Sequence, residues 1–180
     1  MLQITIPEVE LWDEKNQRFS YIKKQTLSLE HSLVSISKWE SKWCKPFLSK
    51  ESKSTEEVLD YIRCMTLTQN VSPDVYKYLS NDNIREINQY IEAPMSACNI
   101  YDENKSPQGR EKITSELIYY WMIAMNIPFE CQKWHLNRLL KLIQVCSIKN
   151  RPPKKMSKQQ LMNRNTALNA SRRKQLNTKG

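Results

Sequence analysis

Apolar and polar positions alternate in the first thirty residues of the chain. In LQITI the three apolar residues fall on one side and the two polar ones on the other, which is the period of a strand. The alternation resumes in VELW after Pro7, and again after the polar turn DEKNQ, where Leu27 and Leu29 share one face. These segments predict a small antiparallel sheet over residues 2–30, either a hairpin or a three-stranded meander. It must pack on the helices that follow, because an isolated hairpin is marginal in water.

From Ser32 onward the apolar residues recur at steps of three and four, which is typical of amphipathic helices. The predicted helical segments are SLVSISKWESKW, STEEVLDYIRCMTL, a short SPDVYKYL, and NDNIREINQYIEA, which Pro94 ends. Ser54 or Thr55 provides the cap of the second helix, with Glu56 and Glu57 in its first turn. The apolar stripes of the three longer helices comprise Leu33, Ile36, Trp39, Trp43, Val58, Tyr61, Ile62, Met65, Ile84, Ile87 and Ile91.

The most apolar helix is predicted in REKITSELIYYWMIAMN, and we expect it to be central to the core. Its expected stripe consists of Ile113, Leu117, Tyr120, Trp121, Ala124 and Met125. Residues 99–109 are interpreted as a mobile surface loop. Pro128 is expected to begin a further helix that reaches to about Ser147.

The diproline in NRPPKK ends that helix and favours an extended segment. In the last thirty residues Leu161, Leu168 and Leu176 are the sparse apolar points, too few to build a core. This part is therefore expected to be an exposed basic helix that is stabilised on docking. The predicted fold is mainly α with a small N-terminal antiparallel β-sheet (α+β). Its parts are a β-hairpin or meander over 1–31, a helical domain over 32–150 and a basic C-terminal arm over 151–180.

The charge of the chain is unevenly placed. Residues 1–130 carry 15 Lys+Arg against 19 Asp+Glu, a net charge of −4, whereas residues 131–180 carry 13 Lys+Arg and no acid. Such asymmetry is typical of an arm that meets an anionic partner: nucleic acid, a membrane surface or an acidic protein face. A tail kept soluble by its charge is the alternative. The cations proposed to act in the arm are Lys154, Lys155, Lys158, Arg164, Arg172, Arg173 and Lys174.

Composition excludes several classes. The chain has only two glycines, Gly109 and Gly180. The sequence therefore contains neither a P-loop nor a dinucleotide-binding motif, because both require several closely spaced glycines. Five scattered cysteines without a C-x-x-C pair indicate reduced thiols in a cytosolic protein. The N-terminus lacks the pattern of a secretory signal. No apolar run approaches the roughly 18 residues that span a bilayer, so no membrane partner is expected.

The segment IPFECQKWHLNRLLKLIQVC, residues 127–146, is the best candidate for chemistry. Cys131 and His135 lie four residues apart and would face the same way on a helix. Zinc requires at least three protein ligands, and the only other histidine is His31, so the spacing argues against a metal site. A nucleophilic Cys–His pair would also need an orienting group and an oxyanion hole, to which nothing in the sequence points. No metal, cofactor or catalytic residue is expected.

The leucines after Trp134 offer a different interpretation. Leu136, Leu139, Leu140, Ile143 and Cys146 form one wide apolar side. Burial within the same domain is the first interpretation. The second is a surface for an apolar partner segment, in which aromatic and Arg side chains would anchor the contact. The predicted holding surface is the helix over residues 134–143 with the YYWM helix beside it. The candidate partner-binding residues are Trp121, Trp134, His135, Arg138, Leu139 and Ile143.

Several stretches resemble a family of small proteins of tailed bacteriophages. These stretches are LEHSLVSISKWESKWCKPFL, EEVLDYIRCMTL, ITSELIYYWMIAMNIPFECQKWHLNRLLKLIQVCSIKN and PPKKMS…NRN…LNASRRKQLNTKG. The resemblance covers nearly the whole chain, and the run from Trp134 to Arg138 is its most distinctive part. It implies a role in virion morphogenesis, as in tail assembly chaperones that coat the tape-measure protein until the tail-tube subunits polymerise. Other members carry only a generic structural label, and the chaperone role is often linked to a frameshifted, extended product.

The residues and the resemblance together predict a non-enzymatic tail assembly chaperone. It would act in the host cytoplasm during assembly and bind apolar helical segments of the tape-measure protein, with the major tail protein as a second partner. Self-association into a homo-oligomer is a further possibility. Two alternative functions are also considered: a structural virion component of the tail or connector that docks through the basic arm, and an accessory protein that binds nucleic acid non-specifically.

Overall fold

The structure is a computed structural model that describes residues 1–13, 18–100, 112–152 and 157–178. The polar turn predicted at DEKNQ, most of the predicted loop 99–109, and Lys154 and Lys155 of the arm therefore lie wholly or partly outside the described residues. The chain forms two compact units, Met1–Lys149 and Asn150–Gly180. The predicted class is confirmed: the chain is mainly helical, with a small antiparallel sheet near its N-terminus.

The N-terminal strands form one long hairpin in two ladders. Strand β1 (Leu2–Ile6) pairs antiparallel with β4 (Gln25–Leu29), and β2 (Val9–Asp13) pairs with β3 (Arg18–Ile22). The register Leu2↔Leu29 continues unchanged to Val9↔Ile22, across an interruption at Pro7, which has no N–H to donate. Of the two predicted arrangements, the hairpin is the correct one. Ile4, Ile6, Leu27 and Leu29 are buried, as the alternation predicts.

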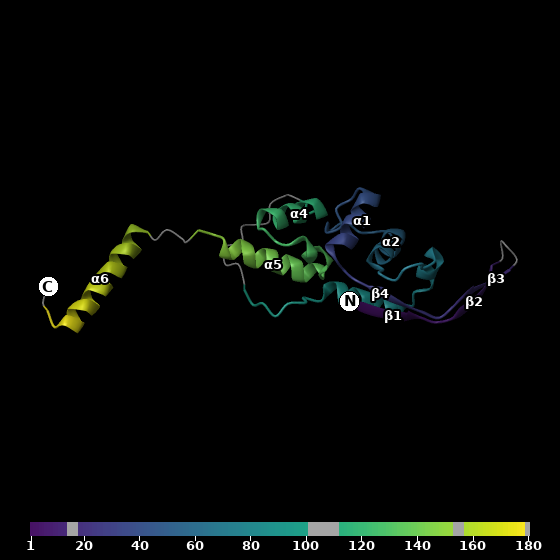
Figure 1. Cartoon of the computed structure of the whole chain (residues 1–180), viewed down its shortest axis with the longest axis horizontal. Coiled ribbons are helices and arrows are strands. Elements are labelled where there is room, and N and C mark those ends of the chain that lie inside the picture. Colours follow the sequence, from purple (N-terminus) through teal and green to yellow (C-terminus); the bar gives the residue numbers. More distant parts are fainter. Residues whose placement is uncertain (14–17, 101–111, 153–156, 179–180) are drawn as a thin grey trace. The chain divides into compact units, whose positions relative to one another are not determined.

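Two capped helices follow the hairpin. Helix α1 (Leu33–Trp43) begins at Ser32 and helix α2 (Thr55–Met65) begins at Ser54, each with a capping box. The segment after α2 returns to the sheet, where Leu67 N–H donates to the carbonyl of Ser28 at 2.8 Å. In Figure 1, β1 and β4 run along one side of these helices.

The positions that α1 and α2 bury agree with the prediction except at Val58 and at Trp43, which is only half-buried. Leu33, Ile36 and Trp39 of α1 are buried. In α2 the predicted stripe is buried apart from Val58, which is 37% exposed. Glu57, one residue earlier, is buried in its place.

A short 3₁₀ helix η1 (Pro73–Tyr78) and helix α3 (Asn81–Glu92) come next. Helix α3 buries Ile87 and Tyr90, whereas the predicted Ile84 and Ile91 are only partly buried. The remaining elements of the first unit are helix α4 (Ser115–Ala124), 3₁₀ helix η2 (Phe129–Lys133) and helix α5 (Leu136–Lys149).

The predicted stripe of α4 is wrong. The helix buries Ser115, Ile118 and Met122, whereas Tyr120 of the predicted stripe is 63% exposed. Ala124 is exposed as well, and Leu117, Trp121 and Met125 are half-buried. Because the helix is apolar on every side, its sequence does not define which side faces inward.

The core of this unit joins all its helices to the hairpin. Its fully buried large side chains include Trp39, Ile4, Ile6, Leu27, Leu29, Leu33, Ile36, Ile62, Met65, Ile87, Ile118, Met122, Leu136 and Leu139. Since these residues come from β1, β4, α1, α2, α3, α4 and α5, the core forms only when distant parts of the sequence meet.

The second unit contains one helix, α6 (Lys158–Leu176). Ser157 begins it with a capping box to Gln160, and Asn177 ends it in the left-handed conformation. Every described side chain of the helix is exposed. The predicted exposed basic helix is therefore present, and its order comes from its own backbone and caps.

Candidate partner-binding surface

The segment Phe129–Lys149 is not one helix, which corrects the prediction. Cys131 belongs to η2, Trp134 is extended, and His135 precedes the first residue of α5. The break has a tertiary cause: Leu136 N–H donates to the carbonyl of His31 at 2.7 Å, and Ser32 pairs with His135 in an isolated β-bridge. Cys131 and His135 consequently do not share a helix face, and their four-residue spacing does not place their side chains on the same side.

The fold instead brings the two histidines together. The rings of His31 and His135 lie 5.0 Å apart between centroids, edge to face, and both residues are buried. Nε2 of His135 donates to the carbonyl of Tyr90 at 2.9 Å, and its Nδ1 accepts from Asn137 N–H at 3.3 Å. His135 thus caps α5 with its ring. Nδ1 of His31 is hydrogen-bonded to the Tyr61 hydroxyl at 2.5 Å.

This environment favours neutral rings. Burial, with repulsion from His135, lowers the pKa of His31 to about 4. Burial also lowers the pKa of His135, although the hydrogen bond to Tyr90 and the charge of Glu30 oppose the shift. Within the described ranges, no group of three or more His, Cys, Asp or Glu side chains could hold a metal ion. The histidine pair joins β4, α2, α3 and α5 and has a packing role.

Three of the predicted partner-binding residues lie in the core. Leu139 is fully buried, and Ile143 and His135 are 7% exposed. The leucine-rich side of α5 packs within its own domain, as the first interpretation proposed. Binding of a partner through these residues stays a prediction, and it would require their side chains to leave the core.

The other three candidates stay at or near the surface. Arg138 is exposed, and its guanidinium lies 4.1 Å from the ring centroid of half-buried Trp134. This contact is a cation–π interaction. Trp121 is half-buried on α4. A role of Trp121, Trp134 and Arg138 in binding a partner stays a prediction.

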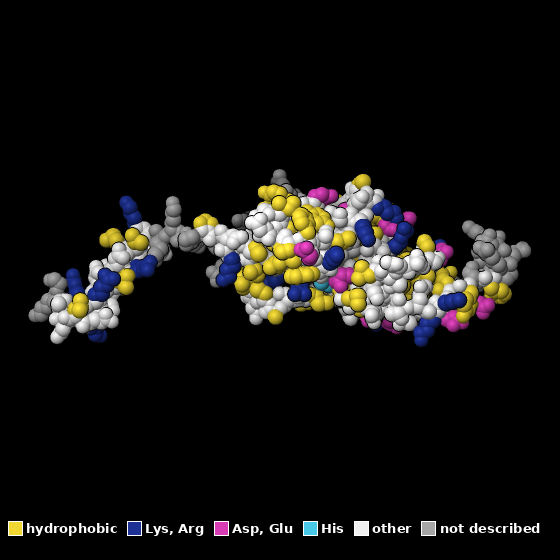
Figure 2. Space-filling view, in the orientation of Figure 1, with side chains coloured by type: hydrophobic (Ala, Val, Ile, Leu, Met, Phe, Trp, Pro, Cys, Tyr) yellow, Lys and Arg dark blue, Asp and Glu magenta, His cyan; other side chains and the backbone are white. Residues whose placement is uncertain are grey.

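Three of the most exposed large apolar side chains of the helical body lie on α4 and η2. Tyr120 is 63% exposed, Ile123 61% and Phe129 53%. Tyr120 and Ile123 are one helical turn apart, and Tyr119 connects them to η2, because its ring lies 6.5 Å from that of Phe129 and its hydroxyl donates to Gln132 at 2.9 Å. We call Tyr119, Tyr120, Ile123, Ala124 and Phe129 the α4–η2 face. In Figure 2, hydrophobic side chains gather over α4 and α5.

Sequence reasoning named the YYWM helix as part of the holding surface but did not identify this side of it. It placed Tyr120 and Ala124 in the core stripe and did not single out Ile123 or Phe129. A signal was nevertheless present, because YYWMIA consists of apolar and aromatic residues only. A helix that is apolar all round either lies inside a core or leaves one apolar side exposed for contact with another molecule. Since α4 is covered on one side only, the second case applies.

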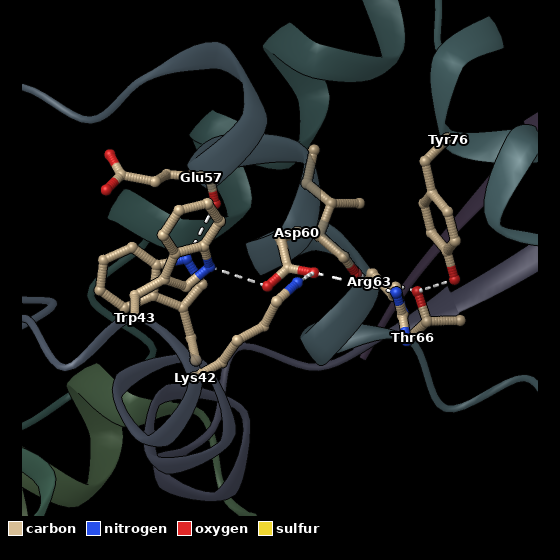
Figure 3. Close-up of polar contacts among 9 residues, drawn as sticks. Lys42, Trp43, Glu57, Asp60, Arg63, Thr66 and Tyr76 are labelled. Carbon is tan, nitrogen blue, oxygen red and sulfur yellow. Dashed lines mark hydrogen bonds and ion pairs between the residues drawn. The ribbon is translucent and has the colours of Figure 1, made fainter.

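The acidic residues of α1 and α2 have structural roles. Figure 3 shows Asp60 between Lys42 and Trp43, which donate to its two oxygens at 2.6 and 2.9 Å. Burial would raise the pKa of Asp60, but these hydrogen bonds outweigh it and the pKa is lowered. The hydrogen bond from Lys45, with that from Ser54, likewise lowers the pKa of Glu57. Asp60 holds α1 against α2, and Glu57 joins the segment after α1 to the start of α2.

Glu40 fixes the start of α4. Its carboxylate is buried and accepts from Phe47 N–H through Oε1 and from Ser115 N–H through Oε2, both at 2.7 Å. The Thr114 side chain provides no cap for α4, so Glu40 supplies the acceptor from a different helix. The α4–η2 face is therefore presented by a helix that is anchored to α1.

The basic arm provides a second candidate region. Lys158, Arg164, Arg172, Arg173 and Lys174 lie on α6, where all are exposed. None of the helices in the part of the chain that the structure describes combines the length and the apolar character needed to cross a bilayer.

Comparisons of the chain with protein-family models, with curated proteins and with solved structures found no match.

Proposed function

We propose that this protein is a non-enzymatic tail assembly chaperone of a tailed bacteriophage. It holds apolar helical segments of the tape-measure protein against the α4–η2 face until tail-tube subunits replace it. The observation that carries the proposal is the exposure of Tyr120, Ile123 and Phe129, each more than half exposed on neighbouring elements. The resemblance of the chain to phage morphogenesis proteins supplies the client.

The face has the physical properties of a holding surface. Single exposed apolar residues are ordinary, but adjacent ones on one helix mark a contact with another molecule. Burying each of these side chains contributes about 1.5–3 kcal/mol. Since the face is small and the cost of association is subtracted from this gain, contact with one client segment would be weak and reversible, as a chaperone requires.

The shape of the face suits an amphipathic helix. An exposed ridge of residues at steps of three and four packs into the groove between the side chains of a second helix. The backbone of α4 is held at its start by Glu40, so little order must be created on binding. The Trp134–Arg138 pair offers an aromatic and cationic contact for client segments that carry a carboxylate.

The proposal is tested by co-expressing the full chain with apolar helical fragments of the tape-measure protein. Ile123→Lys should lower the recovery of soluble client about tenfold, since it replaces one apolar contact by a charge. Leu67→Lys is the matched control, because Leu67 is 57% exposed, close to the 61% of Ile123, and lies outside the face. Equal recovery with both variants would overturn the proposal.

The structural virion component is distinguished by a separate measurement. A chaperone leaves before the particle is complete, so mass spectrometry of purified virions should find the protein absent or far below the tail-tube subunit. Stoichiometric presence would instead support a structural component.

A further inference from the structure

The net charge of the protein belongs entirely to its second unit. Residues 1–149 contain 19 Lys+Arg and 19 Asp+Glu and so have no net formal charge, whereas residues 150–180 contain nine Lys+Arg and no acid. Five of the nine cations lie on α6, whose side chains are all exposed. The sequence of α6 contains neither Asp nor Glu.

The cations surround α6 and do not lie on one side of it. With about 100° of rotation per residue, Lys158, Arg172, Arg173, Arg164 and Lys174 leave no gap wider than about 100° around the axis. A flat acidic protein face or a membrane surface would contact one side of such a helix and leave the other cations in water. An anion with two charged walls that flank the helix would meet cations on opposite sides of it.

The apolar residues of α6 argue against a membrane. A helix that lies on a bilayer needs a broad apolar side opposite its charged side. On α6 the large apolar residues lie within an arc of about 120° around the axis: Leu161, Leu168, Met162 and Leu176. Lys158 and Arg172 lie inside the same arc and Arg164 borders it, so this side of the helix is charged as well as apolar.

We propose that α6 binds double-stranded DNA by lying in the major groove and contacting the phosphates of both walls. The groove is about 12 Å wide and admits one α-helix. Its two walls place phosphates on opposite sides of the helix, which is the arrangement that the ring of cations matches. Asn163 and Asn169 are exposed on the same helix and can donate to phosphate or base oxygens. The contact is independent of sequence.

Binding also completes the folding of α6. The helix has caps at both ends but no core, and Asn, Ser and Thr, which are poor helix formers, occur along it. Isolated helices of this kind are marginal in water. The order of α6 should therefore increase when the duplex encloses it.

The test uses the full chain and a labelled duplex of about 24 base pairs, with anisotropy read between about 50 and 300 mM KCl. Five phosphate contacts predict that log K falls against log[KCl] with a slope of about −4 to −5. Replacing Arg172, Arg173 and Lys174 by Gln should bring the slope up by about 3 and weaken binding on the order of 100-fold near 100 mM salt. A parent slope between 0 and −1 would overturn the proposal.

Two controls test the site and the geometry. Replacing three exposed cations of the body, Lys23, Lys24 and Lys133, by Gln should leave the slope unchanged; an effect equal to that of the arm variant would overturn the assignment to α6. Ala167→Pro keeps every charge but breaks the helix, so it should weaken binding about tenfold and abolish the duplex-induced gain in circular dichroism at 222 nm. Unchanged affinity would overturn the groove geometry.

A third arm addresses the other anionic partners. Vesicles containing about one-third anionic lipid should bind more weakly than the duplex at equal salt, because only one side of α6 can reach a flat surface. Tighter binding to these vesicles, or to an acidic protein chosen as competitor, would replace nucleic acid as the partner of this helix.

Discussion

Residues 1–149 and residues 150–180 differ in nearly every property on which order depends. The first unit has no net charge, and its buried side chains come from β1 and β4 of the hairpin and from all of its described helices, which are distant in sequence. The second has nine cations and one helix with no buried side chain. In the first unit burial of side chains stabilises the helices, and capping adds to it. In the second unit the helix is stabilised by its own backbone hydrogen bonds and caps.

This difference separates the two proposed activities. The α4–η2 face is a rigid surface, because α4 is held by its own core residues and by Glu40. The arm is adaptable, and a partner contributes to its order. A change in one unit should therefore leave the other unaffected, and the following predictions test this independence from the largest expected effect to the smallest.

The largest difference is expected from one substitution made in both units. Leu139→Ala removes a fully buried side chain from α5, so it should lower the free energy of unfolding by about 3–5 kcal/mol through lost burial and a new cavity. Leu161→Ala removes a 48% exposed side chain from α6. It should change the same free energy by less than about 0.5 kcal/mol. Urea unfolding followed by tryptophan fluorescence measures both; equal losses would contradict the separation of the units.

The next effect is a pH dependence confined to the first unit. The pKa of His31 is about 4 in the folded protein, below its ordinary 6.5, so the unfolded state binds more protons between these values. Stability is then fully present above pH 6.5 and falls as the pH drops toward 4, by about 3 kcal/mol if the whole shift is expressed. The lowered pKa of His135 acts in the same direction.

Urea midpoints at about pH 7.5, 6 and 5 measure this loss while avoiding the carboxylates, because the lowered pKa values of Glu57 and Asp60 put their contribution to acid unfolding at lower pH. His31→Asn, which retains an acceptor for Tyr61, should flatten the profile. A profile as steep as that of the parent would show that His31 titrates normally.

A smaller effect is expected at the buried carboxylate that begins α4. Glu40→Ala leaves Phe47 N–H and Ser115 N–H without their acceptor and should cost about 2 kcal/mol of unfolding free energy. The matched control is Glu116→Ala in the first turn of the same helix, where the exposed side chain contributes about 0.5 kcal/mol through the helix dipole. Client binding of the two variants should also be compared. If Glu40→Ala weakened it and Glu116→Ala did not, anchoring of α4 by Glu40 would contribute to client binding as well as to stability.

The sequence predicts the elements of both units better than it predicts the site. The hairpin, α1, α2 and α6 follow from alternation, helical spacing and caps. On α1 the apolar residues occupy one side only, so Leu33, Ile36 and Trp39 could be placed in the core. On α4 apolar residues occupy every side, so the spacing could not separate buried Met122 from exposed Ile123.

The break before α5 could not be predicted for a different reason. It depends on pairing between Ser32 and His135, which are about a hundred residues apart in the chain. Cys131–His135 spacing has meaning only if one helix contains both residues, and a tertiary hydrogen bond to His31 prevents this. The histidine pair and the Glu40 anchor were invisible for the same cause, because each joins elements whose approach only the fold determines.

The smallest effect gives the most direct comparison, because the same cap occurs in both units. Ser54 and Ser157 each form a capping box, with Glu57 in α2 and Gln160 in α6. Ser157→Ala should cost about 0.5–1 kcal/mol of helix stability, and since α6 has no core, the loss appears locally as reduced Cα secondary shifts over residues 158–170, with an unchanged urea midpoint for the body. Ser54→Ala costs a similar amount, but α2 is held by buried Tyr61, Ile62 and Met65, so its secondary shifts should persist while the global midpoint falls. If instead Ser157→Ala lowered the global midpoint, the arm would contribute to the stability of the body and the two units would not be independent.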